Sequence, residues 1–352
     1  MSIKEVISIV AITMLFVMLF IPIVKRIAIH VGAMDIPDKR KVHKTPIPRL
    51  GGIGIYAGFL IGYLLFGHQS VQMNSILIGS FILIITGMID DIKPVPAKYK
   101  FLGQLAAALI IPFYGGIVLK DVSAFGLYIN FGIFSYPLTA FFIVGAINCV
   151  NLIDGLDGLS GGISAIYFLT IGVISLVLNN TNGLDTVLTF IMLGSTLGYL
   201  KHNFYPASIF MGDSGSMFLG YMIAVIALLG YKNVTFTSFI VPMFLLAVPI
   251  LDTSFAILRR FINHKPISMP DKNHLHHQFL KKNFSQRRTV LTIYVIDLLF
   301  AVASVLYVLG NFYVGLVIYV ILFIIILALI LKTDIIFDRS SNTKKDEKEQ
   351  LN

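Results

Sequence analysis

The stretch 1-MSIKEVISIVAITMLFVMLFIPIVKR-26 indicates the kind of fold. Its uncharged run, residues 6–24, is about 19 residues long, close to the roughly 20 residues with which an α-helix crosses the hydrocarbon of a bilayer. A secretory signal has a shorter apolar core and a small-residue cleavage site, and this stretch shows neither. We therefore predict that the chain begins with a membrane helix.

The rest of the chain continues this pattern. Of its 352 residues, 57% are hydrophobic and 13% are charged, whereas a soluble domain has about 25% charged residues. Stretches long enough to span a bilayer lie at about 6–24, 51–67, 74–90, 101–118, 137–153, 162–178, 186–200, 214–230, 237–257, 289–309 and 313–331. We predict an all-α polytopic membrane protein of about eleven transmembrane helices.

The predicted domain organisation is simple. Residues 1–331 form one transmembrane domain, and 332–352 form a charged cytoplasmic tail that we expect to be disordered. The longest outer connection, 119–136, alternates apolar and polar residues around Gly126 and Gly132, which is typical of a small β-hairpin. The single cysteine, Cys149, excludes a disulfide within the chain.

The basic residues predict the orientation. Twenty-four of the 27 Lys and Arg residues lie in the segments 25–50, 91–100, 201–213, 258–288 and 332–352. Cytoplasmic loops carry such an excess, so these segments are predicted to be cytoplasmic, with the N-terminus outside and the C-terminus inside. The net charge of +9 is then a sign of topology, and no nucleic acid is expected as a partner.

The informative acids gather at one membrane face. All are aspartates at predicted cytoplasmic helix ends: Asp90, Asp91, Asp154, Asp157 and Asp213. Transporters hold ionisable residues near the bilayer midplane, whereas an interfacial cluster can bring a water-soluble substrate to a lipid. This position favours an enzyme over a permease.

The segment 88-MIDDIKPVPAKYK-100 places two aspartates at a predicted helix C-terminus. The negative end of the helix dipole disfavours them there, unless a cation such as Mg²⁺ with a diphosphate compensates. Lys93, Lys98 and Lys100 follow and are suited to phosphate oxygens. An ordinary polar interface loop is the alternative.

The segment 148-NCVNLIDGLDGLSGG-162 continues a predicted membrane helix into four glycines. Asn148, Asn151 and Asp154 are spaced by three, so a helix carries them along one side. Glycine lets the backbone approach a ligand closely, and these polar groups suit a uracil, a ribose or Mg²⁺. A decorated Asp-Gly turn is the alternative.

Three further segments carry polar groups on the same face. In 204-FYPASIFMGDSGSMFLG-220, the exposed N–H groups of a predicted helix start can bind an anion, and Asp213 stands there to hold a metal; a plain N-cap is the alternative. In 270-PDKNHLHHQFL-280, three histidines suggest phosphate contact or proton transfer, because no cysteine accompanies them to form a common zinc site. In 35-DIPDKRKVHKTPIPRLGG-52, Lys44 and Arg49 are suited to a phosphate, although a topogenic loop explains most of the charge.

Two acids, Asp252 and Asp297, fall inside predicted spans. Intramembrane acids are functional by default. We nevertheless expect both to be paired structurally within the bundle.

In this order, DD, NxxNxxDGxDG, FMGDxGS and HxHH resemble the polyprenyl-phosphate N-acetylhexosamine-1-phosphate transferases, from about residue 35 to 280. The chain is most similar to the TagO/WecA branch, because Leu275 interrupts the histidines that form an unbroken run in the related MraY branch. The resemblance implies a multi-pass enzyme of the bacterial plasma membrane, with its active site on the cytoplasmic face.

The resemblance also implies a reaction. UDP-GlcNAc and undecaprenyl phosphate give undecaprenyl-diphospho-GlcNAc and UMP, the first membrane step of a surface glycan such as wall teichoic acid. The cofactor is Mg²⁺, with Mn²⁺ as an alternative, and membrane lipid is a further partner. A homodimer is left open. The rival readings are MraY-type transfer of phospho-MurNAc-pentapeptide and, in another class, a polyprenyl-linked sugar flippase or permease.

The site residues implied by the resemblance fall into three groups. The catalytic group is Asp90, Asp91, Asp154, Asp157 and Lys98. The metal position is Asp213 with Asn151. The substrate-binding group is Lys44, Asn148, Asn151, Phe210, Gly212, His274, His276 and His277. Direct attack by the lipid phosphate, with Asp90 as proton acceptor, and a covalent phospho-aspartate both remain open. We favour direct attack, because a phosphate monoester is mostly dianionic at neutral pH.

Overall fold

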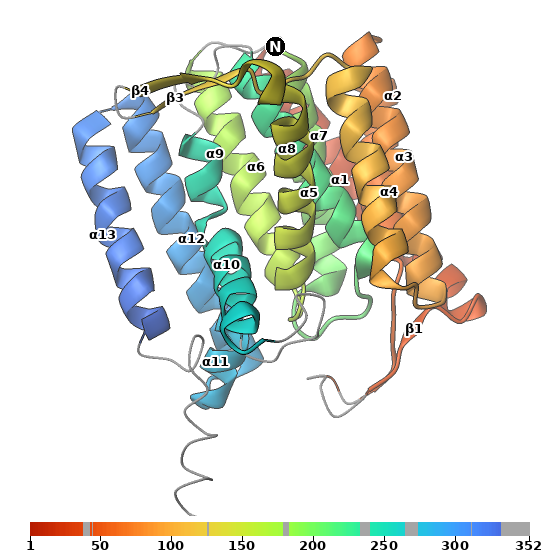
Figure 1. Ribbon diagram of the computed structural model, residues 1–352. Coiled ribbons are helices and arrows are strands. Elements are labelled where there is room, and N and C mark those ends of the chain that lie inside the picture. Colours follow the sequence, from red (N-terminus) through yellow and green to blue (C-terminus); the bar gives the residue numbers. More distant parts are fainter. Residues whose placement is uncertain are drawn as a thin grey trace, which may run out of the picture.

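The computed structural model describes residues 1–37, 43, 45–124, 127–178, 183–232, 240–264, 274–310 and 312–331. These residues form an upright helical bundle with two small sheets (Figure 1). The helices are α1 (Ile3–His30), α2 (Gly51–Phe66), α3 (Val71–Ile92), α4 (Ala97–Phe113), α5 (Ser135–Ile153), α6 (Leu159–Val177), α7 (Leu184–Asn203), α8 (Gly212–Lys232), α9 (Ile240–Leu245), α10 (Ala247–Ile262), α11 (Leu275–Lys281), α12 (Gln286–Leu309) and α13 (Phe312–Leu331).

Both sheets are antiparallel pairs of short strands. β1 (Met34–Asp35) pairs with β2 (Ile47–Pro48), and β3 (Asp121–Ala124) pairs with β4 (Leu127–Asn130). The second pair confirms the hairpin expected in 119–136. A short 3₁₀ turn, η1 (Gly132–Phe134), leads from it into α5.

The described residues include six helices that are long and apolar enough to cross a membrane: α1, α3, the helical stretch Gly132–Ile153, α6, α8 and α12. Two shorter apolar helices are α2 and the part of α13 from Phe312 to Ala328. The chain is therefore a mostly helical membrane protein, as predicted.

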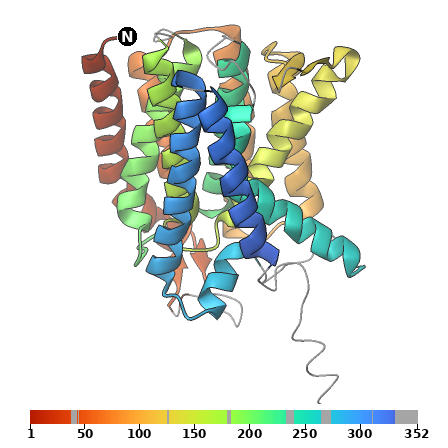
Figure 2. The same ribbon diagram turned by 90° about the vertical axis from the view of Figure 1, so that its left-hand side faces the viewer.

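The predicted ninth span, 237–257, is wrong as a single helix. The described part of this stretch contains α9 and α10, which are separated at Leu246. Pro249 lies inside α10 and has no N–H for the Leu245 carbonyl, and its ring crowds that carbonyl, so the helix breaks there. Beyond the break α10 leans away from the bundle (Figure 2).

Helix α8 lies at the centre of the bundle. Its residues from Met217 to Leu229 are buried, and it packs against α3, α5, α2 and α7. A helix that is apolar all round belongs in such a position. Small residues allow the close approach: a Cβ on Gly52 would collide with the backbone of Gly215, and one on Gly87 with that of Ser214.

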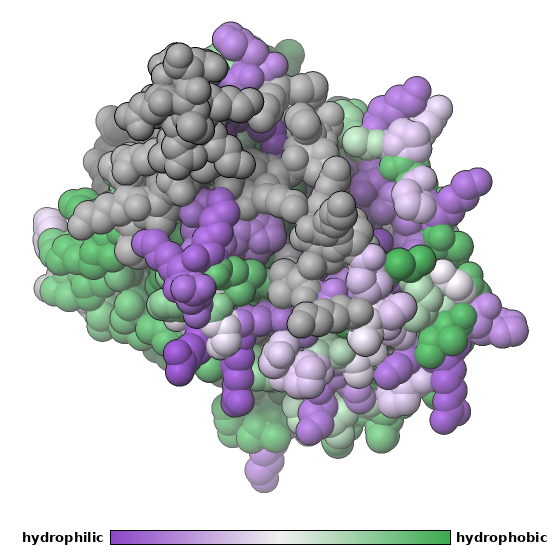
Figure 3. Space-filling view, turned by 90° about the horizontal axis from the view of Figure 1, so that it is seen from below, coloured by the Kyte–Doolittle hydropathy of each residue, from purple (hydrophilic) through white to green (hydrophobic). Residues whose placement is uncertain are grey.

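The polar motifs meet at one end of this bundle. The C-terminal ends of α3 and α5 and the N-terminal end of α8 lie at the bottom of Figure 1, near β1 and α11, while the N-terminus and the β3–β4 hairpin lie at the top. Seen from below, this end presents many hydrophilic side chains, with hydrophobic ones mostly toward the rim (Figure 3). The packing of α8 thus determines where the candidate site forms.

Candidate active site

The carboxylate of Asp91 binds the N-terminus of α8. Its Oδ1 accepts a hydrogen bond from the backbone N–H of Asp213 (2.8 Å). Its Oδ2 accepts from the N–H (3.1 Å) and the hydroxyl (2.7 Å) of Ser214. The first N–H groups of a helix lack partners within the helix, and the positive end of its dipole attracts an anion. Asp91 supplies that anion from another helix.

Gly212 makes this contact possible. Its φ of +70° is a conformation that glycine adopts readily. A Cβ at this position would also collide with the Asp91 carboxylate. The sequence singled out Gly212 as substrate-binding, and the structure places it directly under Asp91.

Asp90 and Asp213 face the basic residue Lys100. Oδ1 of Asp90 accepts from the N–H of Val95 (2.8 Å), and Oδ2 lies 3.3 Å from Lys100 Nζ. The same ammonium group binds Oδ2 of Asp213. Lys100, in the first turn of α4, therefore bridges acids from α3 and α8.

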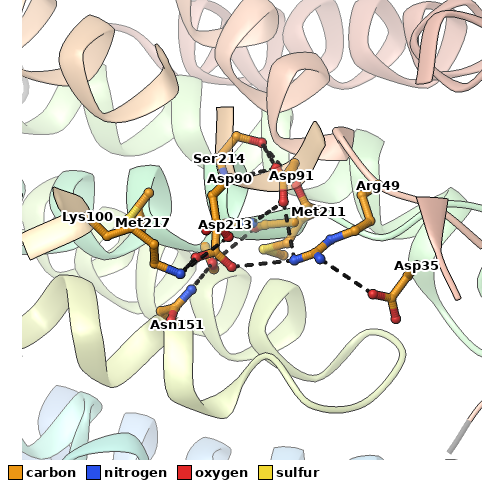
Figure 4. A network of polar contacts seen from close by, with 12 residues as sticks. Asp35, Arg49, Asp90, Asp91, Lys100, Asn151, Met211, Asp213, Ser214 and Met217 are labelled. Atoms are coloured by element: carbon orange, nitrogen blue, oxygen red, sulfur yellow. Dashed lines mark hydrogen bonds and ion pairs between the residues drawn. The ribbon is translucent and has the colours of Figure 1, made fainter. Parts of the chain in front are cut away.

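Arg49 approaches the acids from the opposite side (Figure 4). Its Nη2 is 3.3 Å from Asp91 Oδ1 and 3.5 Å from Asp213 Oδ1, and its Nη1 is 3.5 Å from Asp35 Oδ1. Asp35 in turn contacts the imidazole of His43 at 3.3 Å. Two cations thus flank three carboxylates, which leaves the cluster acidic.

The cluster suits a divalent cation. Asp90, Asp91 and Asp213 each offer an oxygen within 4.8 Å of the others. Mg²⁺ prefers oxygen ligands and is bound through one or two carboxylates together with substrate phosphates. Both oxygens of Asp91 are held by hydrogen bonds from the start of α8, whereas one oxygen of Asp90 and both of Asp213 face the cationic side chains of Lys100 and Arg49, with which a metal ion can exchange. Asp90 and Asp213 are therefore the better candidates. The amide of Asn151, predicted as a second metal ligand, donates to Ser216 Oγ at 2.8 Å and lies beside this cluster (Figure 4).

The two aspartates of the loop between α5 and α6 make different contacts. Asp157 accepts a hydrogen bond from the N–H of Ala207 (2.9 Å), which attaches the loop to the segment before α8. Asp154 accepts from the hydroxyl of Ser160 (2.5 Å). Burial, with smaller contributions from Asp213 and Asp91, raises the pKa of the Asp154 carboxyl to about 7 despite the opposing Ser160 hydrogen bond and Arg49 charge. Asp154 is thus suited to exchange a proton near neutral pH.

A cavity of about 280 Å³ opens beside the acids. It is lined by Asp35, His43, Arg49, Asp154, Gly155, Leu156, Asp157, Asn203, Phe210, Gly212, His277 and Gln286. The edge of the His43 ring meets the Phe210 ring at 5.2 Å. The volume of the cavity lies just below the 300–1,000 Å³ typical of small-molecule sites, so the cavity has room for part of a nucleotide-sized ligand.

The histidines lie around α11 at the edge of this cavity. His276 sits against the loop, because a Cβ on Gly155 would lie 2.5 Å from His276 Nε2. Burial and the neighbouring His277 lower the pKa of His276 to about 3, against the opposing effect of Asp252. His276 is therefore neutral at pH 7, while His277 lines the cavity.

Some predicted site residues lie elsewhere or are engaged by other groups. Lys98 is exposed, with its ammonium 4.9 Å from the Tyr99 ring centre, and the structure brings Lys100 rather than Lys98 to the acids. The Asn148 amide donates to Gln104 Oε1 and to the carbonyl of Val144, both at 2.8 Å. Lys44 lies outside the described residues.

The two intramembrane acids differ from each other. Asp252 is paired as expected, with His274 and the backbone of Leu275. Asp297 is buried in α12, and within the described residues neither of its carboxyl oxygens has a hydrogen-bond partner. The expectation of structural pairing is therefore wrong for Asp297.

Asp35, Arg49 and Lys100 are absent from the three groups of site residues that the sequence predicts. Lys100 and Arg49 lie in segments that the sequence predicts to contact phosphate. Each has basic neighbours that are equally plausible: Lys100 is one of three lysines that follow Asp91, and four other basic residues precede Arg49 between residues 38 and 44. The spacing along the chain does not show which cation reaches the acids. For Asp35 the sequence carried no signal, because its partner Arg49 is brought to it by the β1–β2 pairing.

The chain was compared with known proteins. The model of glycosyl transferase family 4 matches residues 73–231, which contain α3 to α8. A probable undecaprenyl-phosphate N-acetylglucosaminyl 1-phosphate transferase of Bacillus subtilis is 42% identical over 84% of this chain and 82% of its own length. The chain belongs to the polyprenyl-phosphate N-acetylhexosamine-1-phosphate transferase family.

Two further relatives are less similar to this chain than the Bacillus subtilis protein. A decaprenyl-phosphate N-acetylglucosaminephosphotransferase of Mycolicibacterium smegmatis is 32% identical over 77% of this chain and 74% of its own length. An undecaprenyl-phosphate alpha-N-acetylglucosaminyl 1-phosphate transferase of Escherichia coli K12 is 29% identical over 83% of this chain and 81% of its own length. The resemblance found in the motifs is thus confirmed, and it extends beyond them.

The raised pKa of Asp154 predicts a pH-dependent stability. The native carboxyl holds its proton up to about pH 7, whereas an unfolded aspartate loses it near pH 3.9. The native state therefore loses stability as the pH rises from about 4 to about 7, and this loss persists at higher pH. We expect Asp154→Asn, in buffer without divalent cations, to raise the melting temperature by several degrees at pH 8 and by clearly less at pH 5, where only part of this loss has occurred. An equal rise at both pH values would contradict this assignment.

Proposed function

We propose that the chain transfers GlcNAc-1-phosphate from UDP-GlcNAc to undecaprenyl phosphate, releasing UMP. The observation that carries this proposal is the pair Asp90 and Asp213, flanked by Lys100 and by Arg49, which also lines the cavity. The named relatives support it, because they are transferases of this kind acting on polyprenyl phosphates. The product would be the first lipid-linked intermediate of a surface glycan, such as wall teichoic acid.

The reaction brings several negative charges together. An oxygen of the acceptor phosphate bonds to the β-phosphorus of the donor, the bond from that phosphorus to the bridging oxygen breaks, and UMP leaves with the electron pair. Lys100 and Arg49 stabilise charge on the diphosphate as the leaving group forms. Each can do so by moving from a carboxylate to a phosphate oxygen.

The divalent cation of this proposal is Mg²⁺, with Mn²⁺ as an alternative. Asp90 and Asp213 would hold it, with Asn151 close by. When bound, such an ion neutralises phosphate charge and orients the oxygens for in-line displacement. Asp91 contributes indirectly, because its contact with Ser214 keeps Asp213 at the helix start.

Direct attack is favoured over a phospho-aspartate. The acceptor phosphate is mostly dianionic at neutral pH and is already a nucleophile. Both oxygens of Asp90 and both of Asp91 are hydrogen-bonded, which makes either a poor nucleophile. Asp90 remains placed to take a proton from an acceptor that arrives as the monoanion.

The donor nucleoside would occupy the cavity. Phe210 offers an aromatic face to the uracil, and Asp154, Asp157 and His277 line the same space. Lys44, Asn148, Gly212, His274 and His276 complete the predicted substrate group. The acceptor lipid would approach along the exposed apolar side chains of α10, among them Ile257, Leu258, Phe261 and Ile262.

We further propose eleven crossings, with α9 and α10 counted as one, an outer N-terminus and a cytoplasmic C-terminus in a bacterial plasma membrane. The concentration of Lys and Arg in the segments around the site supports this orientation. The active site then lies on the cytoplasmic face, where nucleotide sugars are available.

The reaction is tested by the nucleotide that is released. Washed membranes containing the protein, given undecaprenyl phosphate, Mg²⁺ and UDP-GlcNAc, are expected to release UMP, as measured by chromatography. UDP-MurNAc-pentapeptide in a parallel reaction is expected to release none. Release of UDP, or no UMP with either donor, would contradict the proposed function, and UMP with the second donor alone would favour the MraY-type reaction.

The two nearby lysines are expected to differ. Lys100→Met removes the cation between Asp90 and Asp213, so we expect kcat to fall by about 100-fold or more, as when one electrostatic donor is removed from a site. Lys98→Met should cost much less, and Lys93→Met, at an exposed position after α3, should leave kcat nearly unchanged. A larger loss of kcat in Lys98→Met than in Lys100→Met would show that Lys98, and not Lys100, belongs to the catalytic group.

The metal site is tested by binding. At a concentration 100 times its dissociation constant, Mg²⁺ should stabilise the folded protein by about 2.7 kcal/mol, measured as a rise in melting temperature. The Asp213→Asn protein should show no such rise, since it keeps the shape of the side chain and loses its charge. If Asp213→Asn were stabilised as strongly as the unchanged protein, Asp213 would not be a metal ligand.

A further inference from the structure

Asp252 directs its carboxylate at the start of α11. Oδ1 accepts a hydrogen bond from the N–H of Leu275 at 2.7 Å, and Oδ2 lies 2.9 Å from His274 Nδ1. Both side chains are almost fully buried, with 3% of Asp252 and 6% of His274 exposed. His274 is the N-cap residue of α11, yet its own side chain makes no capping hydrogen bond. Asp252 provides the cap from α10 instead.

This contact determines the protonation of one ring nitrogen. An ionised carboxylate can only accept, so the hydrogen between the two groups is carried by His274 Nδ1. Nε2 of a neutral ring is then left as the acceptor. Asp252 therefore holds the helix through one oxygen and selects the tautomer of His274 through the other.

His274 connects this pair to the candidate active site. Its ring is parallel to that of His276, with centroids 5.8 Å apart, and the His276 and His277 centroids are 4.2 Å apart. His276 lies against Gly155 of the α5–α6 loop, and His277 lines the cavity. Asp252 is thus connected to the cavity through three neighbouring histidines, His274, His276 and His277.

We propose that Asp252 is a positioning residue for the transfer reaction, which it supports by fixing the tautomer of His274 and the place of α11 against the α5–α6 loop. This inference rests on the function proposed above. Asp252 belongs to none of the motifs that carry the family resemblance, and its contacts with His274 and Leu275 give it a role apart from the acidic cluster.

Asp252→Asn separates the two tasks of the carboxylate. The amide oxygen can still accept from the N–H of Leu275, which preserves the cap. The amide nitrogen, facing His274 Nδ1, is a donor, so the imidazole must present an unprotonated Nδ1. The helix and His277 then keep their positions while the tautomer reverses.

The experiment combines kinetics with nitrogen NMR of the whole protein in detergent. The chain is labelled with ¹⁵N-histidine, and the His274 signals are assigned by their loss in His274→Gln. For Asp252→Asn we expect kcat for UMP release to fall about tenfold or more, the size of effect seen in metal sites when the hydrogen-bond partner that orients a histidine is changed. The KM for UDP-GlcNAc should change much less than kcat, because α11 and the cavity-lining His277 keep their positions. The His274 Nδ1 signal should move to the unprotonated range.

Asp185→Asn is the matched control. Asp185 is also a buried aspartate, in the first turn of α7, a full helix away from the cavity-lining Asn203. It should change neither kcat nor the His274 signals. Asp252→Glu, which retains a carboxylate, should recover part of the kcat that Asp252→Asn loses.

Three results would overturn the proposal. One is full kcat in Asp252→Asn, and another is a fall in kcat with the Nδ1 signal unchanged, which would mark a merely structural effect. The third is an unprotonated Nδ1 in the unchanged protein. A protein that releases no UMP but shows a protonated Nδ1 would instead contradict the proposed function and leave the Asp252–His274 pairing in place.

Discussion

The contact between the Asp91 carboxylate and the N-terminus of α8 is the constraint on which the candidate site depends. A helix that starts inside a protein exposes N–H groups that need acceptors, and buried groups of this kind cannot obtain them from water. Asp91 satisfies two of these groups and the Ser214 hydroxyl. The same contact accounts for an acid at the unfavourable C-terminal end of α3, because the positive end of α8 faces it.

From that contact the arrangement of charges follows. Holding the start of α8 against α3 places Asp213 beside Asp90 and within reach of Lys100 and Arg49. Gly52 and Gly87 permit the approach, since a Cβ on either would collide with the first turn of α8. Three acids and two cations form a strongly charged site with a net negative charge, and a metal ion or phosphate entering it must exchange with these partners. Such a site is suited to phosphoryl transfer, in which charge neutralisation is the main requirement.

The α5–α6 loop and the histidines at α11 lie beside this acidic cluster and are held in place by separate contacts. Asp157 and Asn203 attach the α5–α6 loop to the segment before α8 through backbone contacts, which leaves Asp154 facing the cavity. On the other side Asp252 holds α11 and its histidines against the same loop. The break at Leu246 contributes to this arrangement, because α10 can lean outward and still place Asp252 near α11. A continuous ninth helix, as the hydropathy predicted, would have run straight through the bundle.

The sequence by itself determined the membrane class, the helical content and the end of the bundle at which the acids gather. These depend on local properties: the length of an apolar run, and the position of a charge at its end. It also identified Asp90, Asp91, Asp154, Asp157 and Asp213 as one group, because each lies at a helix terminus. Only the tertiary structure decided that Lys100 rather than Lys98 reaches the acids, that Arg49 joins Asp35 to the cluster, and that Asp252 is paired whereas Asp297 has no hydrogen-bond partner in the described part of the chain. Those outcomes depend on which helix faces which, and this is set by the packing of small residues around α8, a property that no single segment contains.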